Sequence, residues 1–488
     1  IQKYPYYTLY LVGATLSFIL SYWVLLYRQP INVDGILYLN TANTFLQSGI
    51  RATFHSYSWP YYSIGIAVIH KLTFLNLEHS ARFFDALLGS LITVAFVAVI
   101  KEFGANQRVL LWALIVILVF PFLNHLRDNI LRDFGYNAFM LLSFVYFLRF
   151  LREQRFSQAI AWNLLTLVAI LFRGEGLIIF IAAPLFLVFQ TQLTLLQRLT
   201  NILRLYTLPL FFSLIALSII LFNRHISLVN IVNSTEIFRY LIHGTNWIYT
   251  NFTVKETLLR QTLFNNGLYN AVWLFLLAGM FAIFLQTFIN TIGFTFFVLA
   301  CFALYYHLIP KESAIRLSWC SYILLNLVII LGFIATDLFL ADRYVLQLTL
   351  FIMLSVPFSI DFFYENWRNK TANFAGNKWV FPIISLCLIA QAISSLSHFG
   401  PSKSYILDAG NWIQQNTPPQ ILFYTNDAQL AYYSKRAGTI YPDDFLGLQD
   451  PLQNIRQVDL KKYDYAAILL PNSLQNEAGS IYYTFGKK

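Results

Sequence analysis

The stretch Tyr6–Tyr27, YYTLYLVGATLSFILSYWVLLY, decides the fold class because it contains no charged side chain. A helix that crosses a bilayer needs about 20 mostly apolar residues, and this run is long enough. The run is apolar throughout and does not alternate at a period of two residues, which favours a helix over a strand of a membrane barrel. No small-residue cleavage site follows it, so we expect a retained membrane-spanning helix.

The composition extends this prediction to most of the chain. Hydrophobic residues make up 58% of the 488 residues and charged residues 11%, against roughly half and a quarter in an average soluble domain. We therefore expect an all-α polytopic membrane protein with about 11 to 13 transmembrane helices. The runs at 158–190 and 268–309 are too long for one helix each. The other apolar runs are 82–100, 108–125, 134–150, 205–222, 317–336, 344–360 and 379–397.

Basic residues gather in the loops between apolar runs, and such loops face the cytoplasm. This rule places Asp34 and residues 398–488 on the outer side, and it requires an odd number of crossings within 268–309. One span with a re-entrant piece, or three short spans, would satisfy it. The net charge of +10 follows from these loops and gives no reason to expect a nucleic-acid partner. The cytoplasmic loops are defined by Lys101, Arg108, Arg149, Arg152, Arg155, Arg198, Arg204, Lys311, Arg316, Arg368, Lys370 and Lys378.

The domain organisation follows from where polar segments occur. Residues 1–397 form the predicted transmembrane domain, with a first outer loop at 28–81 that carries interfacial helices. A second outer loop, 223–266, is rich in Asn and Thr, and a lid over a substrate is one interpretation of it. Proline and amide residues increase in residues 398–488, where we predict a small periplasmic α/β domain. Its predicted strands are 421–425 and 465–470, and its predicted helices are 405–416 and 427–436.

The first candidate site is Asp34, which follows the first apolar run and is accompanied by Tyr38, Arg51 and His55. Asp34 lies ahead of an amphipathic stretch that we expect to lie flat in the membrane interface. A carboxylate in this place is positioned to take a proton from an incoming hydroxyl group. Capping of the interfacial helix is the alternative role for Asp34.

The second candidate is a dense group of charges that contains Arg127, Asp128, Arg132 and Asp133. Their spacing allows two neighbouring acid–base pairs on a helical turn. Arginines in such a group can hold a phosphate, and a carboxylate beside them can hold a metal ion or a sugar hydroxyl. A solvated, salt-bridged loop is the alternative.

Two further charged motifs interrupt or follow apolar runs. In Arg173-Gly174-Glu175-Gly176 the two charges are expected to neutralise each other or a ligand, and the glycines allow a tight reversal between two short helices. A purely architectural pair is the alternative. Arg343 and Tyr344 begin a late helix on the outer side, where Arg343 can reach a lipid phosphate. Charges near a bilayer are costly, which makes all four groups candidates for function.

These groups belong to a series of short motifs. The series is Asp34-Gly35 with Tyr38, Trp59-Pro60, Ala81-Arg82-Phe83, Arg132-Asp133, Arg173-Gly174-Glu175-Gly176 and Asp342-Arg343-Tyr344. In this order the chain resembles the GT-C superfamily of membrane glycosyltransferases. Within it the chain is most similar to the protein O-mannosyltransferase and aminoarabinose-transferase type, called glycosyltransferase family 39-like.

The resemblance implies a multi-pass protein of the bacterial inner membrane with its active site facing the periplasm. It implies transfer of a sugar, with inversion, from a polyprenyl-phosphate donor to a lipid, glycan or protein acceptor, and it assigns Asp34 and Asp133 as the two acids. Members often have two adjacent acids where this chain has Asp34-Gly35, and His-Pro-Pro where it has Trp59-Pro60-Tyr61. These departures leave metal use and the acceptor open.

We therefore expect the donor phosphate to meet Arg132, Arg343 and Arg173, while Asp34 orients or deprotonates the acceptor. No cofactor is expected other than a divalent metal ion, for which Asp34 and Asp133 are the candidate ligands. The three cysteines lie inside apolar runs, which excludes a disulfide framework and a cysteine metal site. A transporter or flippase of lipid-linked sugars, or a non-catalytic assembly subunit, would also explain the helices.

Overall fold

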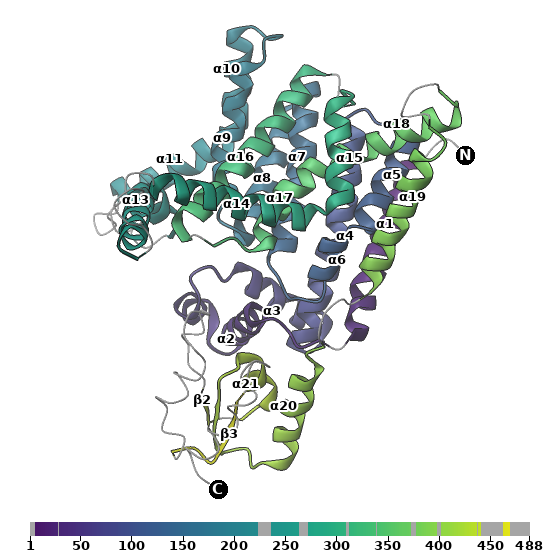
Figure 1. Ribbon diagram of the computed structural model, residues 1–488. Helices are drawn as coiled ribbons and strands as arrows, with labels where there is room; N and C mark the ends of the chain where they lie inside the picture. The colour runs from purple at the N-terminus through teal and green to yellow at the C-terminus, as the bar shows by residue number, and fades with distance from the viewer. Residues whose placement is uncertain are drawn as a thin grey trace.

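The computed structural model describes residues 5–27, 29–222, 236–262, 272–308, 312–337, 339–371, 377–397, 402–436, 438–440 and 462–468. Helices make up one large bundle, and a smaller unit of helices and short strands lies at one end of it (Figure 1). The predicted fold class, an all-α polytopic membrane protein with a small C-terminal α/β unit, is confirmed.

The bundle contains helices of two lengths. Five helices of the described part are long and apolar enough to cross a membrane, and α17 and α18 form a further apolar pair bent by 40°. The total of about 11 to 13 crossings stays a prediction. The long helices are α1 (Pro5–Val24), α4 (Leu77–Glu102), α7 (Asp133–Glu153), α14 (Val272–Ile292) and α16 (Ser313–Asp337), and the bent pair is α17 (Asp342–Met353) with α18 (Val356–Arg368). Shorter apolar helices are α5 (Gln107–Leu118), α8 (Phe156–Phe172), α9 (Gly176–Ala182) with η2 (Ala183–Phe189), α15 (Phe294–Tyr305) and α19 (Val380–Leu396).

The two overlong apolar runs are each divided at a glycine-containing break. The run at 158–190 divides between α8 and α9 at the predicted motif that begins with Arg173. The described part of 268–309 divides at Gly293, whose φ of 73° suits a residue without a side chain. Helix α14 is long enough to span the membrane, and α15, which follows it, is shorter. Of the two predicted arrangements for 268–309, this fits one span with a re-entrant piece better than three short spans.

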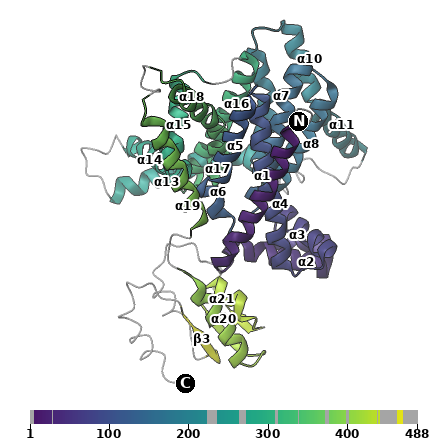
Figure 2. The ribbon, with the colours of Figure 1, turned by 90° about the vertical axis from the view of Figure 1, so that its right-hand side faces the viewer.

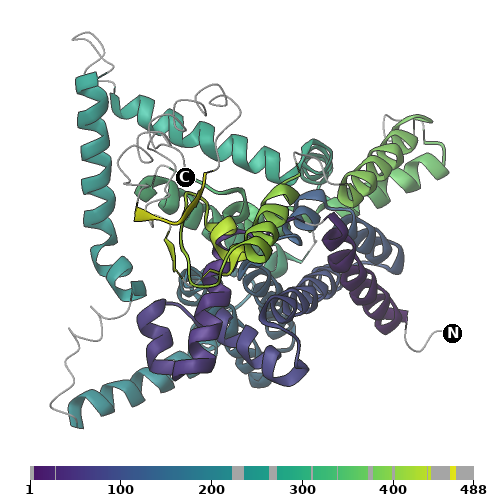
Figure 3. The same cartoon turned by 90° about the horizontal axis from the view of Figure 1, so that it is seen from below.

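The remaining helices lie at the ends or the edge of the bundle. Helices α2 and α3 lie at the end that carries the C-terminal unit, and α10 lies at the opposite end (Figure 1). Helix α13 lies at the edge (Figure 3), and it occupies the described part of the segment predicted as the loop 223–266. These elements are η1 (Leu25–Tyr27), α2 (Val33–Ser56), α3 (Tyr61–Thr73), α6 (Pro121–Leu126), α10 (Leu195–Leu205), α11 (Thr207–Phe222) and α13 (Glu236–Thr262).

Ion pairs join the helix ends that were predicted to face the cytoplasm. Glu102, at the end of α4, pairs with Arg149 at 2.7 Å and with Arg152 at 3.3 Å, both near the end of α7. Arg152 also reaches Glu312 at 3.0 Å, just before α16. Basic residues of these loops therefore help to hold neighbouring helices together.

Arg127 has a structural role, which corrects its predicted place in a substrate site. Its buried guanidinium donates hydrogen bonds to Ser17 O at 3.0 Å, Ser17 Oγ at 2.8 Å, Ser21 Oγ at 2.6 Å and Asn124 Oδ1 at 2.8 Å. These bonds fasten α1 to the turn before α7. The predicted pairing of Arg127 with a neighbouring carboxylate is wrong, because its guanidinium donates to oxygen atoms of α1 and of Asn124 instead.

The C-terminal unit has its own small apolar core. Its three strands are parallel in the order β2-β1-β3, and Ile406, Ile413, Phe423 and Leu430 are buried between sheet and helices. The two predicted helices and the predicted strand 421–425 are confirmed, whereas β2 was not predicted. The predicted strand 465–470 is present over its first three residues, and its residues 469–470 lie outside the described part of the chain. The elements are α20 (Ser404–Asn416), β1 (Leu422–Thr425), α21 (Ala428–Ser434), β2 (Gly438–Ile440) and β3 (Tyr465–Ala467).

Helix α21 binds the short loop that leads from α1 into α2 (Figure 2). Gln429 Nε2 donates to the carbonyl oxygen of Ile31 at 2.7 Å, and the amide of Ile31 donates to the Tyr433 hydroxyl at 3.1 Å. Both backbone groups of one buried residue are therefore satisfied by the C-terminal unit. Ile31 lies three positions before Asp34, so this contact fixes where α2 begins.

Replacing Arg127 by methionine should destabilise the bundle. The change leaves the oxygens of Ser17 and Ser21 without their charged donor, which costs roughly 2–3 kcal/mol. We expect a clear fall in the midpoint of thermal unfolding of the purified protein in detergent. Arg155→Met is the control, because the Arg155 side chain is 72% exposed. Equal midpoints for both variants would contradict the structural role of Arg127.

Replacing Tyr433 by phenylalanine should release one backbone amide. Loss of one neutral hydrogen bond of about 1 kcal/mol corresponds to roughly fivefold faster exchange of the Ile31 amide. Hydrogen–deuterium exchange of the peptide that contains Ile31 measures this change. Tyr432→Phe is the matched control, because the Tyr432 hydroxyl has no hydrogen-bond partner among the residues that the structure describes. An unchanged rate in Tyr433→Phe would show that the contact does not hold the loop.

Candidate active site

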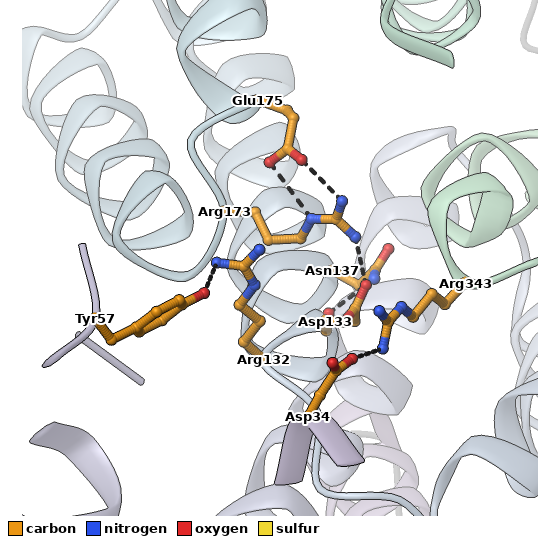
Figure 4. Close-up of polar contacts among 8 residues, drawn as sticks. All are labelled: Asp34, Tyr57, Arg132, Asp133, Asn137, Arg173, Glu175 and Arg343. Atoms are coloured by element: carbon orange, nitrogen blue, oxygen red, sulfur yellow. Dashed lines mark hydrogen bonds and ion pairs between the residues drawn. The ribbon is translucent and has the colours of Figure 1, made fainter. Parts of the chain in front are cut away.

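Four chain segments meet at the end of the bundle that carries α2. They are the first turn of α2 with Asp34, the first turn of α7 with Asp133, the turn between α8 and α9 with Arg173, and the first turn of α17 with Arg343. Figure 4 shows their side chains pointing toward one another. Residues far apart in the sequence therefore form one charged cluster.

Asp34 forms an ion pair with Arg343 at the open side of this cluster. The pair joins Asp34 Oδ2 to Arg343 Nη1, and the two side chains are 37% and 27% exposed. Both residues line a cavity of about 210 Å³, which Asn32, Val33, Leu126, Asn129 and Leu131 complete. The carboxylate faces Arg343 instead of capping α2, whose N-cap residue is Asn32. A solvent-accessible pair of this kind can exchange its partner for a charged ligand.

The sequence before Asp34 fixes this arrangement. The Asn32 side chain accepts a hydrogen bond from the amide of Ile130 at 2.9 Å and donates one to the carbonyl oxygen of Ile130 at 3.3 Å. Gly35 permits the close approach, because a Cβ there would lie 2.7 Å from Asn32 Oδ1 and 3.0 Å from Ile130 Cβ. The first turn of α2 is thereby held against the segment that leads into α7.

Asp133, Arg173 and Glu175 form the buried part of the cluster. Arg173 Nη1 lies 2.5 Å from Asp133 Oδ1, and Arg173 Nη2 lies 2.8 Å from Glu175 Oε1. The Asp133 and Arg173 side chains are only 4% and 6% exposed. Burial alone would raise the pKa of Glu175, but the Arg173 guanidinium holds this pKa below its ordinary value. The predicted pairing of Arg173 with Glu175 is confirmed.

The spacing of these charges had suggested local acid–base pairs, but Asp133 does not pair with its neighbour Arg132. Arg132 instead donates a hydrogen bond to the Tyr57 hydroxyl at 3.0 Å (Figure 4). Asp133 opens α7, so its side chain turns into the bundle toward Arg173, while Arg132 remains partly exposed. The prediction of two local acid–base pairs is therefore wrong for Arg127, Arg132 and Asp133, whose side chains bond to residues of distant segments instead.

A second, smaller cavity lies behind Arg343. Its volume is about 20 Å³, and Arg343 lines both this cavity and the larger one. The Tyr344 ring faces the Arg173 guanidinium, whose central carbon lies 4.5 Å from the ring centroid. The predicted pair Arg343 and Tyr344 thus lies inside the cluster. The lining residues are Tyr136, Asn137, Arg173, Glu175, Asn326, Ile329, Ile330, Phe333, Arg343, Tyr344 and Gln347.

The other predicted site residues lie outside the cluster or beneath it. Tyr38 is buried, and its ring packs edge-on against Tyr62 with 5.0 Å between centroids. Burial raises the pKa of Tyr38 well above its ordinary value, so its hydroxyl stays protonated. Arg51 and His55 are exposed in the second half of α2, after a kink at Gly49. Asp128 is partly buried, and its carbonyl oxygen accepts a hydrogen bond from Arg82 at 3.2 Å.

Asp85 was not predicted. This buried carboxylate of α4 accepts hydrogen bonds from the Tyr62 hydroxyl at 2.7 Å and from the amide of Leu131 at 3.2 Å. It thereby joins α3 and α4 to the segment that leads into α7. An acid within the apolar run 82–100 is the sequence signal that could have identified it, since such residues are usually paired.

The described carboxylates do not fit a resident metal ion. No group of three or more His, Cys, Asp or Glu side chains gathers in the described ranges. Asp34 and Asp133, the predicted candidate ligands, are each paired with an arginine. A divalent cation bound by oxygen atoms needs about six ligands and would be repelled by these guanidinium groups. The charges of the cluster are balanced by protein side chains.

Part of the chain matches a known protein family, and its fold matches solved structures. Residues 54–231 match the family model described as dolichyl-phosphate-mannose-protein mannosyltransferase. No curated protein sequence matches the chain. The apo structure of the Archaeoglobus fulgidus oligosaccharyltransferase matches with a TM-score of 0.54 at 13% identity, over 93% of this chain and 66% of that one.

Two further solved structures match. The same oligosaccharyltransferase, tethered to an acceptor peptide that contains the NVT sequon, matches with a TM-score of 0.53 at 13% identity, over 90% of this chain and 64% of that one. ArnT from Cupriavidus metallidurans in the apo state matches with a TM-score of 0.47 at 14% identity, over 96% and 94%. The predicted resemblance is confirmed at the level of the fold: the chain has the fold of the Archaeoglobus fulgidus oligosaccharyltransferase, and within residues 54–231 it is similar to the dolichyl-phosphate-mannose-protein mannosyltransferase family.

Proposed function

We propose that this protein is a membrane glycosyltransferase that moves a sugar from a polyprenyl-phosphate donor to a lipid, glycan or protein acceptor, with inversion. The observation that carries the proposal is the partly exposed pair of Asp34 and Arg343 beside a cavity of about 210 Å³. A carboxylate and a guanidinium at one cavity supply the two groups that such a transfer needs. The match to the mannosyltransferase family model supports this assignment.

In the proposed reaction the donor phosphate binds Arg343 and takes over the guanidinium from Asp34. Guanidinium groups bind phosphate oxygens with two parallel hydrogen bonds, so the exchange is favourable. The freed carboxylate accepts the proton of the acceptor hydroxyl as its oxygen attacks the anomeric carbon. The bond between that carbon and the phosphate oxygen breaks, and the electron pair leaves with the polyprenyl phosphate. Arg343 stabilises the negative charge of the leaving group.

Asp133 acts as a positioning residue in this proposal. Its side chain is nearly inaccessible and is paired with Arg173, which also holds Glu175. An acid in this setting cannot approach an acceptor in the larger cavity without breaking a buried ion pair. We therefore assign the catalytic role to Asp34 alone, and Arg173 becomes a support of the site instead of a phosphate ligand.

The active site is assigned to the outer membrane face, which in a bacterial cell is the periplasmic face of the inner membrane. The cluster, α2, α3 and the C-terminal unit lie at one end of the bundle (Figures 1 and 2), and the ends joined by Glu102, Arg149 and Arg152 lie away from it. Transporters place their charged binding groups near the bilayer midplane. The gathering of charges at one end favours transfer over transport.

Asp34→Asn should abolish transfer without loss of folding. The amide keeps the shape of the side chain but cannot accept the proton, and loss of a general base lowers rates by about 10²–10⁴-fold. Transfer of radiolabelled sugar from polyprenyl-phosphate donors to a membrane extract measures the effect. Asp128→Asn, a partly buried acid outside the two cavities, is the control. Full activity in Asp34→Asn would refute the proposed base.

Arg343→Gln should weaken binding of polyprenyl phosphate. A charge-assisted hydrogen bond contributes roughly 1.5–3 kcal/mol, which corresponds to about 10- to 100-fold in affinity. Binding of the sugar-free lipid in detergent, measured by a shift in melting temperature, tests this without an acceptor. Arg51→Gln is the matched control, because Arg51 is exposed and far along α2. Equal affinities for the two variants would remove Arg343 from the donor site.

Removal of divalent cations should leave transfer unchanged. The proposed leaving group is stabilised by arginines, and the carboxylates are paired with them. A titration with EDTA, followed by addition of Mg²⁺ or Mn²⁺, measures the dependence. Loss of transfer that either metal restores would contradict this prediction and show that the reaction needs a divalent cation.

A further inference from the structure

We propose that Gln347 and Asn137 form a subsite that recognises a hydroxyl group of the donor sugar. The inference rests on the proposed function, because it names the part of the donor that the small cavity behind Arg343 receives. It goes beyond that function by assigning sugar recognition to two neutral amides instead of the charged residues.

Gln347 is the first reason for this assignment. It lies one turn after Arg343 on α17, is only 3% exposed, and lines the small cavity. Neither its Nε2 nor its Oε1 has a hydrogen-bond partner among the described residues. A buried amide without partners is costly, so such a group in a cavity indicates a polar ligand.

Asn137 faces the same cavity from α7. Its Nδ2 donates to the carbonyl oxygen of Asp133 at 2.8 Å, which fixes the side chain. Its Oδ1 has no partner in the described part of the chain, and the residue is 1% exposed. Arg343 Nε also lacks a partner there. The unpaired atoms are therefore two donors, Gln347 Nε2 and Arg343 Nε, and two acceptors, Gln347 Oε1 and Asn137 Oδ1.

This combination suits a hydroxyl group better than an anion. A hydroxyl donates one hydrogen bond and accepts others, so it can satisfy acceptors and donors together. A phosphate oxygen only accepts, and it would face the amide oxygens Gln347 Oε1 and Asn137 Oδ1 without a proton between them. If the oxygen and nitrogen atoms of the Gln347 amide were exchanged, the side chain would still offer one donor and one acceptor. The conclusion therefore does not depend on which atom is assigned as oxygen.

Three of the other polar side chains around the cavity have partners in the protein. Arg173 and Glu175 pair with each other at 2.8 Å, and the Asn326 amide donates to the carbonyl oxygen of Tyr322 at 2.8 Å. Gln347 and Asn137 supply buried amide atoms of the lining that lack a partner among the described residues. Apolar faces are supplied by the rings of Tyr136, Phe333 and Tyr344.

The size and position of the cavity fit one edge of a sugar. Its volume of about 20 Å³ holds one water molecule or one hydroxyl group. Arg343 forms the wall between it and the larger cavity. A phosphate on the guanidinium of Arg343 therefore places an attached sugar where one of its hydroxyl groups can reach the amides and displace a water molecule.

Stability is the first test, because it needs no ligand. Gln347→Leu keeps the approximate volume and removes the unpaired polar atoms, so the ligand-free variant should melt at or above the temperature of the parent. Thr349→Val is the matched control, because the Thr349 hydroxyl on the same helix is also buried and unpaired in the described residues but lines neither cavity. A melting temperature well below both would show that Gln347 supports the fold, and would overturn the inference.

Lipid binding is the second test. The probes are polyprenyl phosphate without a sugar and polyprenyl phosphates that carry a hexose, an N-acetylhexosamine or an aminopentose. Gln347→Leu should lose at least tenfold in affinity for one or more sugar-bearing lipids, and less than twofold for the sugar-free lipid. Thr349→Val should match the parent with every probe.

The outcomes separate this inference from the proposed function. If Gln347→Leu weakens the sugar-free lipid as much as the sugar-bearing ones, or weakens none of them, the amides do not read the sugar and the inference is wrong. If the parent binds none of these lipids, the proposed function fails, and the inference that rests on it fails for a different reason. If Arg343→Gln loses binding of the sugar-free lipid and Gln347→Leu retains it, the result supports both the proposed function and the inference.

Discussion

The buried guanidinium of Arg173 is the charge around which the site is organised. At the edge of a bilayer an unpaired charge is costly, so Arg173 must be neutralised. Asp133 supplies one carboxylate from α7, and Glu175 supplies another from the turn after α8. The Tyr344 ring then covers the same guanidinium from α17. Three segments of the chain are thereby held at fixed positions by one side chain.

The second ion pair has a different physical character. Asp34 and Arg343 are partly exposed and lie beside the larger cavity, so water can solvate each of them if the pair separates. Separation of Arg173 from Asp133 would instead leave a buried charge alone, which is far more costly. The cluster therefore combines a buried, rigid ion pair, Arg173 with Asp133, and a pair that can open, Asp34 with Arg343. The pair that can open lies beside the larger cavity, where a substrate fits.

The sequence was sufficient to predict the helical fold, two of the three described strands and the two described helices of the C-terminal unit, and the gathering of Asp34, Arg173 and Arg343. Long apolar runs and isolated charges carry that information directly. Apart from the local pair of Arg173 with Glu175, the partners of the charges could not be predicted, because they come from helices far along the chain: Arg127 bonds to Ser17 across 110 positions. Likewise Gln347 gave no signal, since one amide in an apolar run looks the same whether its partner is a protein group or a ligand.

The place of Asp34 depends on α21, Ile31 and Ile130, none of which lines the larger cavity. Both backbone groups of Ile31 bond to α21, and the side chain of Asn32 bonds to both backbone groups of Ile130. The loop is thus held from the C-terminal unit on one side and from the segment before α7 on the other. With its backbone fixed from both sides, Asp34 can change partner through side-chain rotation alone. A binding event on the C-terminal unit that moved α21 would therefore alter the alignment of Asp34 with Arg343 without any contact to the substrate.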